Sequence, residues 1–390
     1  MELEENINIA REQEIEIEDT SSGDDIIIHP FNPNEIEIET PPYTVGYLMD
    51  NIEHNEINMN TDFQRSGNLW SEDKQSRLIE SILLGLPLPA FYFDTSNNPW
   101  DIIDGLQRCC SIQNFCVKKT LQLKGLEFLG YRNGEQYLEG KSFDDLDRTL
   151  QRSIITRPIT INKLKKADKN VRYVLFKRLN TGGLELTSAE IRNAVFQGVP
   201  ADTLKELSEI QEFKNATGNR ISFKRMEDRD FVSRFVAFYL IDYQKYEPGL
   251  DDFINKSMDL LEIIDVNTLK KDFKDALNLS VKIFGDDAFR KRFGKNDRRK
   301  PINKAYFEVI TVTFAKLSGV EKQSLERNKN LFKSNLVKLM NNNRYSSALS
   351  GGTGTRDRVN IRFSLFKQVV DKSINGIKIK VTDDNKVENF

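Results

Sequence analysis

The sequence predicts an α+β protein in which a small mixed core is followed by a large, all-helical region. Three observations support this prediction. At 390 residues the chain is long enough for roughly two to three domains. Between residues 90 and 165, short apolar and alternating runs are separated by turn residues, which is typical of strands. After about residue 200, apolar side chains recur almost throughout at the three- and four-residue spacing of helices.

The charges of the chain nearly cancel but are strongly segregated. The sequence holds 57 basic and 59 acidic residues, a formal net charge of -2. Residues 1–40 contain thirteen acidic side chains and one basic side chain, a charge of -12, so the other 350 residues carry +10. The body of the chain is therefore basic and its N-terminal arm is acidic.

The composition argues against several classes of protein. No apolar run approaches the roughly 18–20 residues of a membrane span, and the acidic N-terminus lacks the apolar segment of a secretory signal. The three cysteines lie within residues 109–116, which is no disulfide framework and predicts a reducing cytoplasm. The two histidines, His29 and His54, fall in the least structured part of the chain, which argues against histidine-dependent catalysis.

Glutamate and isoleucine alternate in two segments of the acidic arm, 14–18 and 35–39. Such alternation suits a strand, but dense negative charge opposes one unless a basic partner neutralises it. One interpretation is a disordered, solvated arm. The other is an arm that covers the basic body and competes with nucleic acid. The composition favours the first, so residues 1–40 are predicted to be a disordered arm.

Cap and turn residues define the elements of the predicted core. Ser71, which two acidic residues follow, predicts the start of a helix that Gly85 ends. Residues 90–93 and 100–104 predict a hairpin around the turn at 95–99. Further predicted elements are a helix over 106–117, strands between 121 and 128, a hairpin at Asn133-Gly134, a helix that Ser142 caps, a strand over 158–164 and a helix from Asp168 to Leu179.

The second half of the chain is predicted to be helical. Thr187 and Glu190 have the spacing of a capping box, which predicts that a helix starts there. A glycine-rich loop over 350–355 interrupts the last part. The predicted helices cover roughly 201–214, 226–243, 250–263, 268–284, 301–317, 323–340 and 360–373.

A candidate phosphate site lies where the strand 100–104 meets the following helix. The strand ends in Asp104, Gly105 permits a tight turn, and Gln107 and Arg108 fall in the first helical turn. A helix N-terminus binds phosphate through unpaired N–H groups and partial positive charge, and an arginine adds a bidentate donor. Asp104 is a candidate ligand for Mg²⁺ or a ribose hydroxyl. The structural alternative is an Asp104–Arg108 pair that only fixes the turn, and the spacing alone favours that alternative.

Several motifs in order resemble the N-terminal domain of GmrSD-type modification-dependent restriction systems. They are Phe63-Gln64-Arg65, Trp70, "LIESILLGLPLPAFYF" at 78–93, "DGLQR" at 104–108 and "LFKRLNTGGLELTSAEIRNAVF" at 175–196. The resemblance extends more weakly through 228–240 and 351–355, so it covers about residues 41–370. It implies a nucleotide-binding core with a fold similar to ParB and sulfiredoxin.

The family's Asp-Gly-Gln-Gln-Arg motif is associated with binding and hydrolysis of nucleoside triphosphates. The resemblance therefore implies catalytic roles for Asp104, Gln107 and Arg108, with Asp104 as the metal ligand. Leu106 stands in place of the family's first glutamine and removes one polar contact. The residues that the resemblance implies for nucleotide or phosphate binding are Gln64, Arg65, Gly105, Asn180, Gly182 and Gly183.

The glycines at 182 and 183 have two interpretations. Adjacent glycines let backbone N–H groups converge on an anion, and glycine also ends helices by default. The residues alone leave these alternatives even, and the resemblance favours the anion site. Glu190 and Arg192 belong to the same signature, although the capping box already explains Glu190.

A basic cluster lies between residues 290 and 304, with eight cations against one acid, Asp297. Such a cluster is typical either of a solvated face or of a phosphate-backbone footprint, and a basic body in this family favours DNA. A second candidate surface runs from Arg344 to Arg362. The residues of the cluster that we expect to bind DNA are Arg290, Arg292, Lys295, Arg298, Arg299 and Lys300.

In the restriction enzymes that the chain resembles, a histidine-containing ββα-metal (HNH) domain cuts DNA. With His29 and His54 as its two histidines, the sequence lacks that motif. We therefore expect a stand-alone member whose nuclease is a separate subunit. The expected organisation is an acidic arm over 1–40, a nucleotide-binding domain over 41–200, and a helical domain over 201–390 that binds DNA or a partner.

The leading hypothesis is a cytoplasmic, Mg²⁺-dependent NTP hydrolase that senses or regulates in an anti-phage or modification-dependent restriction system. Its expected partners are a nucleoside triphosphate, DNA, a nuclease subunit and a second copy of the chain, with no membrane. The alternative is a non-catalytic DNA-binding or adaptor protein with a degenerate nucleotide pocket, which Leu106 and the missing nuclease favour. A third hypothesis is direct nucleolysis by the core. The sequence leaves open whether the protein is an enzyme.

Overall fold

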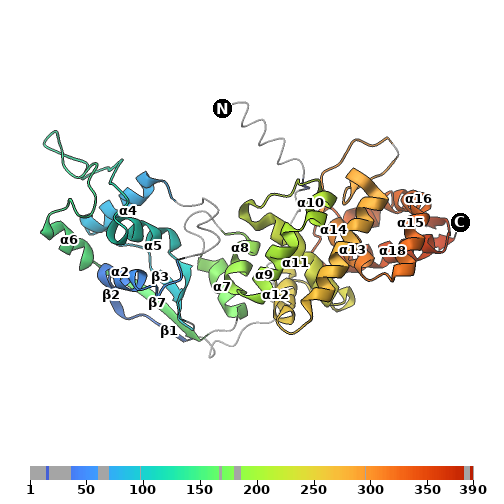
Figure 1. Ribbon diagram of the computed structural model, residues 1–390, viewed down its shortest axis with the longest axis horizontal. Coiled ribbons are helices and arrows are strands. Elements are labelled where there is room, and N and C mark those ends of the chain that lie inside the picture. The colour runs from blue at the N-terminus through green and yellow to red at the C-terminus, as the bar shows by residue number, and fades with distance from the viewer. Residues whose placement is uncertain are drawn as a thin grey trace. The chain divides into compact units, whose positions relative to one another are not determined.

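The computed structural model describes residues 15–16, 37–59, 70–96, 98–166, 169–179, 186–294, 296–381 and 387–389. The chain divides into two compact units, of which one spans residues 31–186 and the other spans residues 187–390 together with residues 1–30. The first unit contains a mixed sheet and the second is largely helical (Figure 1). The predicted α+β class, with a mixed core before a helical region, is confirmed.

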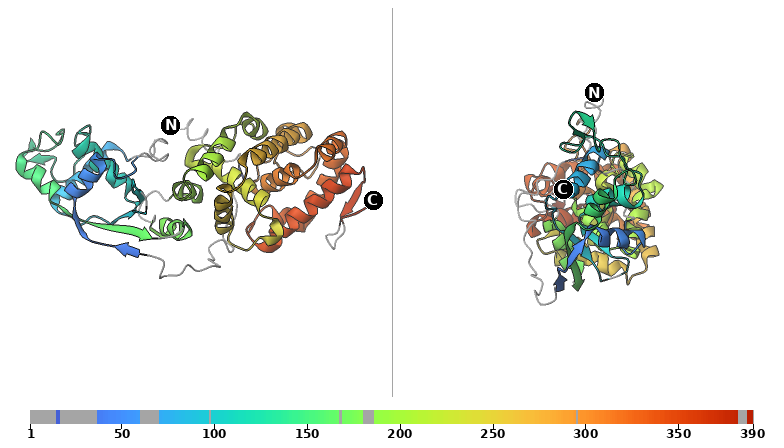
Figure 2. Two further views of the ribbon diagram at one scale, coloured as in Figure 1. Left: turned by 60° about the horizontal axis from the view of Figure 1, so that its bottom comes forward. Right: turned by 90° about the vertical axis from the view of Figure 1, so that its left-hand side faces the viewer.

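A mixed sheet organises the first unit, and five of its strands fall within the described residues. β3 (Phe91–Asp94) runs parallel to β7 (Pro158–Lys166), and β4 (Asp101–Asp104) pairs antiparallel with β3. β1 (Glu37–Glu39) and β2 (Pro42–Thr44) pair antiparallel with successive parts of β7, as Figure 2 shows. The predicted hairpin and the strand beginning at residue 158 are confirmed.

β1 belongs to the segment for which the composition predicted disorder. Glu37 lies opposite Lys166 and Glu39 opposite Lys163, and the Glu39 carboxylate forms an ion pair with Lys165. Basic side chains of β7 thus neutralise the alternating glutamates, which is the condition under which such a segment suits a strand. The prediction of disorder is therefore wrong for residues 37–39.

Helices cover the sheet on the face that Phe91, Phe93 and Ile161 present, and together they form the core of the unit. Ile103 and Leu164 alternate to the other face, and α7 packs on β4. The three cysteines are buried, and burial raises the pKa of Cys109 and Cys116. The helices are α2 (Val45–Glu53), α4 (Glu72–Leu84), α5 (Leu106–Ile112) with its π-helical continuation η2 (Gln113–Val117), α6 (Arg148–Ile155) and α7 (Lys169–Leu179).

Local cap chemistry sets several of these ends as predicted. The Ser71 hydroxyl accepts a hydrogen bond from the backbone N–H of Lys74, and Gly85 ends α4 in the left-handed conformation, with φ of 81°. The helix predicted to start at Ser142 starts instead after Asp147, whose carboxylate accepts from the Leu150 N–H at 2.9 Å. Ser142 donates to Asp145 in the preceding turn. The carboxylate thus serves as the cap in place of the hydroxyl.

The strands predicted between residues 121 and 128 do not form in this described stretch. Two carboxylates bond its backbone N–H groups, which leaves them unavailable for a ladder. The buried Glu80 accepts from the N–H groups of residues 127–129 at 2.7–3.0 Å, and Glu139 accepts from those of residues 125 and 126. The hairpin predicted at Asn133-Gly134 does form, from β5 (Tyr131–Arg132) and β6 (Glu135–Gln136).

The second unit packs its helices around α14, whose side chains are buried on almost every side. α14 contacts α11, α13 and α18, and α18 lies along α16 (Figure 1). Among the described residues, no helix is both long and apolar enough to cross a membrane. The helices are α8 (Ser188–Val195), α9 (Val199–Glu209), α10 (Gln211–Thr217), α11 (Glu227–Leu240), α12 (Leu250–Leu261), α13 (Val266–Phe284), α14 (Lys304–Ala315), α15 (Gly319–Arg327), α16 (Lys329–Met340), α17 (Asn343–Ala348) and α18 (Arg356–Ile374).

Two details of the second unit depart from the sequence prediction. The helices predicted over 201–214 and 323–340 are each divided, at Ile210 and at Asn328, whose backbones leave the helical conformation. A short hairpin of β8 (Ile379–Val381) and β9 (Val387–Asn389) follows α18, so the unit is not purely helical. The remaining elements are the 3-10 turns η3 (Lys224–Met226), η4 (Tyr243–Lys245) and η5 (Gly285–Asp287).

Candidate functional site

The strand–turn–helix that the sequence predicted around residue 105 is present. β4 ends at Asp104, and Gly105 turns the chain into α5 with φ of 103°, a conformation that favours glycine. A Cβ atom at Gly105 would lie 2.7 Å from Cδ1 of Phe91. Glycine is thus required here both by its backbone conformation and by the close approach of a core ring.

Arg108 lies on the inner side of this turn and is 7% exposed. Its Nη2 donates to Oδ2 of Asp104 at 2.7 Å and to the carbonyl oxygen of Ala90 at 3.2 Å, and its Nη1 donates to the carbonyl of Pro89. The guanidinium also stacks over the ring of Phe91, 4.5 Å from its centroid. Arg108 therefore holds the turn against the start of β3, which is the structural alternative that the spacing favoured.

Asp104 is the more accessible member of the pair, with 31% of its side chain exposed. Its partial burial raises its pKa, and the charge of Arg108 offsets only part of this effect. Ionisation of the Asp104 carboxyl, next to the first turn of α5, thus costs free energy in the folded protein. A carboxylate kept under such conditions at a strand end is a candidate functional group.

Gln107 connects the motif to Trp70, the residue before the cap of α4. The Gln107 Oε1 accepts from the Trp70 backbone N–H at 2.9 Å, and Gln75 Nε2 donates to the Trp70 carbonyl at 2.7 Å. Asn114 in turn donates to Oε1 of Gln75 at 3.0 Å. Gln107 is thus a positioning residue that fixes where the chain enters α4, a role that the sequence did not indicate.

Five of the predicted nucleotide-binding residues lie outside the described residues. Two of them lie in the segment 60–69. Before this segment, the Asn58 backbone N–H donates to the Trp100 carbonyl at 2.8 Å, and the Asn58 side chain donates to Asp101 on β4 at 3.0 Å. After the segment, Trp70 bonds to Gln107 as described above. Both flanks of the segment 60–69 therefore attach beside the motif. The five residues are Gln64, Arg65, Asn180, Gly182 and Gly183.

Comparison with known families supports the resemblance seen in the sequence. Residues 45–197 match the family described as GmrSD restriction endonuclease, N-terminal domain. This segment is similar to the GmrSD N-terminal domain. It contains β4, the Gly105 turn and α5, together with Thr187, Glu190 and Arg192. No curated protein and no solved structure gives a significant match to the chain.

The end of the matched segment forms α8, which belongs to the helical unit. Thr187 and Glu190 form the predicted capping box, and Glu190 also forms an ion pair with Arg225 at 3.0 Å. Arg192, which is 2% exposed, donates to Asp251 at 2.8 Å and to Asn255 at 3.1 Å on α12. These signature residues join α8 to its neighbours.

The described residues of the matched segment 45–197 can be compared with the ligand groups that hold metal ions in proteins. None of them belongs to a group of three or more His, Cys, Asp or Glu side chains placed to hold an ion. Asp104 offers one carboxylate, and one of its oxygens is bonded to Arg108. This donor set does not fit a protein-held Mg²⁺ ion, which needs further oxygen ligands.

A buried lysine on β7 was not predicted. Lys163 is 9% exposed, and its ammonium lies 4.0 Å from the ring centroid of Trp100, with Tyr43 and Tyr47 at 4.6 and 5.1 Å. It also donates to the Tyr47 hydroxyl at 2.9 Å. Burial tends to lower the pKa of Lys163, but the hydrogen bonds that it donates to the two tyrosines outweigh this effect and raise the pKa. The lysine stays charged inside an aromatic cage.

The basic cluster of the helical unit splits into inward and outward side chains. Arg290 is 5% exposed and donates to the Lys300 carbonyl, and Arg292 pairs with Asp287. Arg298, Arg299 and Lys300 are exposed, with Arg299 donating to the carbonyl of Asp286. Lys295 lies outside the described residues. Of the predicted DNA-binding set, three residues therefore face solvent in the part that the structure describes.

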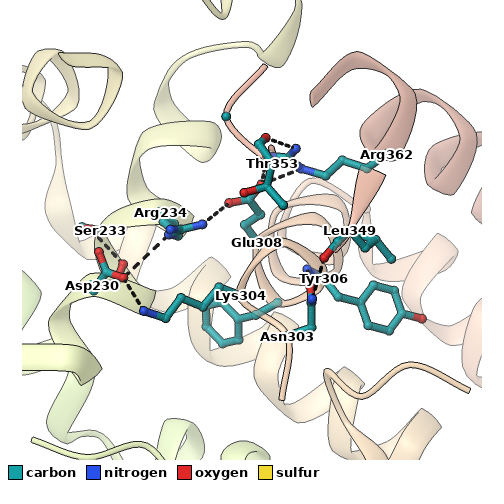
Figure 3. Close-up of polar contacts among 12 residues, drawn as sticks. Asp230, Ser233, Arg234, Asn303, Lys304, Tyr306, Glu308, Leu349, Thr353 and Arg362 are labelled. Carbon is teal, nitrogen blue, oxygen red and sulfur yellow. Dashed lines mark hydrogen bonds and ion pairs between the residues drawn. The ribbon is translucent and has the colours of Figure 1, made fainter. Parts of the chain in front are cut away.

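Lys304, at the end of the cluster, belongs to a chain of buried and half-buried charges (Figure 3). It donates to Asp230 on α11 at 3.0 Å, and Arg234 lies 3.8 Å from the same carboxylate and 3.7 Å from Glu308. Glu308 pairs with Arg362, whose Nη1 donates to the Thr353 carbonyl. Burial would raise the pKa of Asp230, but the neighbouring cations outweigh it and hold the pKa well below its usual value. These cations stabilise the fold rather than face a ligand.

Proposed function

We propose that the chain is the nucleotide-binding sensor or regulator of a bacterial anti-phage or modification-dependent restriction system. The observation that carries this proposal is the match of residues 45–197 to the GmrSD N-terminal domain, together with the strand–turn–helix that this segment contains at Asp104 and Gly105. The sequence after His54 contains no histidine. In this proposal a separate nuclease subunit cleaves the DNA, in the cytoplasm.

In this proposal the start of α5 receives the phosphates of a nucleoside triphosphate. The first turn of a helix carries N–H groups without intrahelical acceptors, and these favour an anion. Gly105 supplies the left-handed backbone conformation that leads the chain from β4 into this first turn. Arg108 acts by holding the turn, since its donors already reach Asp104, Pro89 and Ala90.

Asp104 is the candidate that orients the attacking water or the nucleotide's own Mg²⁺. Mg²⁺ is commonly bound by one or two carboxylates plus substrate phosphates, so the ion would arrive with the nucleotide. Gln64, Arg65, Asn180, Gly182 and Gly183 remain proposed phosphate contacts. Catalysis at such a site rests on positioning and charge stabilisation.

The test is phosphate release from each of the four NTPs with Mg²⁺, with and without duplex DNA. Wild type is compared with Asp104→Asn and with the matched control Asp144→Asn, whose side chain is 62% exposed and pairs with Lys119. We expect release in wild type and the control, and its loss in Asp104→Asn with a melting temperature no lower than that of wild type. Release that persists in Asp104→Asn, or that is absent throughout even though nucleotide binds, would reject hydrolysis at this turn.

A second candidate function is DNA binding without hydrolysis. The observation that favours it is the run of three exposed cations, Arg298, Arg299 and Lys300, in the helical unit. Exposed arginines and lysines bind the phosphate backbone with strong salt dependence. Charge reversal at Arg298 and Arg299 should weaken binding of a duplex of about 20 base pairs, whereas the same reversal at Arg327 and Lys329 should not. Equal loss in both variants would show a general charge effect only.

A further inference from the structure

Two basic segments that are far apart in the sequence lie side by side in the helical unit. The Asn303 side chain donates to the Leu349 carbonyl at 2.6 Å (Figure 3). The Lys291 ammonium donates to the Ser350 hydroxyl at 2.9 Å. The segment around residues 290–303 and the segment around 344–358 therefore form one continuous surface, with Lys291 and Ser350 at the junction.

This surface carries exposed cations on both sides of the junction. Arg298, Arg299 and Lys300 are exposed on the first segment, and Arg344 and Arg356 are exposed on the second. Lys291 itself is only 8% exposed. A buried ammonium needs an anionic or strongly polar partner, because desolvation disfavours an unpaired charge.

The acidic arm provides that partner at Glu16. The Glu16 backbone N–H donates to the Ile302 carbonyl at 2.8 Å, and Ile15 forms a parallel bridge with Ile302. The Glu16 carboxylate forms an ion pair with Lys291 at 2.5 Å. Within the described residues, the groups that reach the Lys291 ammonium are this carboxylate and the Ser350 hydroxyl.

We propose that Lys291 and Ser350 form a phosphate-binding position for the backbone of a nucleic acid, and that Glu16 occupies this position in cis. A carboxylate oxygen and a phosphate oxygen accept the same charge-assisted hydrogen bonds, so one substitutes for the other. Glu16 belongs to the acidic arm, whose residues 1–40 carry a net charge of -12 in the sequence. The acidic arm is thus a competitor that lowers the affinity for DNA.

This inference rests on the second candidate function, DNA binding by the helical unit. The test measures binding of a labelled duplex of about 20 base pairs to the full chain by fluorescence anisotropy, over a range of salt concentrations. The variants are Glu16→Gln, Glu16→Gln with Lys291→Gln, and Arg298→Glu with Arg299→Glu. Glu37→Gln is the matched control, because it removes the same charge from the other Glu-Ile segment.

We expect Glu16→Gln to tighten binding by about 3- to 10-fold and to steepen the dependence of log K on log salt by about one unit. Adding Lys291→Gln should reverse both effects, and Glu37→Gln should produce neither. The double variant, Glu16→Gln with Lys291→Gln, leaves neither charge of the pair, so it keeps the comparison valid if Glu16→Gln alone lowers the melting temperature. At a temperature at which both variants are folded, the double variant should bind the duplex more weakly than Glu16→Gln.

The outcomes separate the inference from the function on which it rests. If the Arg298 and Arg299 reversal weakens binding but Glu16→Gln changes nothing, the DNA surface stands and the inference is overturned. An equal gain in Glu37→Gln also overturns it, since the effect would then be one of net charge. If neither wild type nor Glu16→Gln binds the duplex, both the inference and the DNA-binding function fail.

Discussion

Glu308 on α14 and Arg362 on α18 form an ion pair from which solvent is excluded, since both side chains are 0% exposed. The Nε and Nη2 atoms of Arg362 both donate to Oε1 of Glu308. Arg362 also donates to the carbonyl of Thr353 in the glycine-rich loop. The pair thus ties the loop to the centre of the helical unit and aligns the helices that form its core.

Removing the Glu308 carboxylate should be strongly destabilising. Glu308→Ala leaves Arg362 with an uncompensated charge in the interior, and such losses cost about 3–5 kcal/mol. Urea unfolding followed by circular dichroism measures this free energy. The control is Asp371→Ala, which breaks the exposed pair with Lys367 and should change the stability little. Similar effects of the two substitutions would contradict a structural role for the buried pair.

Substitution of Gly105 should disturb the turn through both of its constraints. Gly105→Ala places a Cβ atom 2.7 Å from the Phe91 ring at φ of 103°, and we expect a loss of about 2–4 kcal/mol in the free energy of unfolding. Gly319→Ala is the matched control, because a Cβ atom there meets nothing within 4 Å. It lies in the first turn of α15 and should be neutral or stabilise slightly. A tolerated Gly105→Ala would mean that this turn is readily remodelled.

Asp104 should reduce stability at neutral pH. Its pKa is raised in the folded chain, chiefly by burial, so the folded state binds its proton more tightly than the unfolded state. The contribution of Asp104 to stability therefore falls as the pH rises through the unfolded and then the folded pKa. Asp104→Asn should unfold at a temperature equal to or above that of wild type at pH 7, and the difference should vanish below about pH 4. A lower melting temperature at pH 7 would show that the ionised pair with Arg108 stabilises the fold.

Gln107 should control the environment of Trp70. In a Trp100→Phe background, Trp70 is the single tryptophan of the chain. Gln107→Ala removes the side-chain acceptor of the Trp70 backbone N–H, which frees the chain around Trp70. The emission of Trp70 should therefore shift to longer wavelength, and acrylamide should quench it more strongly. Gln113→Ala, one and a half turns further along the same helical run, is the control and should leave the emission unchanged. An unaltered spectrum in Gln107→Ala would show that Gln75 alone holds the entry to α4.

Features with a local cause were predictable from the sequence. The cap at Ser71, the left-handed glycine at 85 and the capping box at Thr187 and Glu190 all involve partners within five residues. The Asp104–Arg108 pair likewise follows from a four-residue spacing on adjoining elements. Such contacts form whatever the rest of the chain does, which is why pattern and propensity suffice for them.

Features with distant partners were not predictable. Glu39 pairs with Lys165, which lies 126 positions further along the chain, and this ion pair links β1 to β7. The inward direction of Lys291 and Lys304 depends on Glu16 and Asp230, so the linear cluster overstated the exposed charge. The cage around Lys163 draws its rings from two separate segments, Tyr43 and Tyr47 from one and Trp100 from the other. A composition profile counts such charges and rings but does not show which of them meet.

The place of α8 has a consequence for how the molecule is divided. The family match runs to residue 197, whereas the compact unit that contains the sheet ends at residue 186. A fragment cut at residue 197 would carry Arg192 without Asp251 and Asn255, and Glu190 without Arg225. The segment that the family shares and the compact unit that contains the sheet therefore differ by one helix. Transfer of the family segment to another protein requires a recipient that supplies partners for α8 equivalent to Asp251, Asn255 and Arg225.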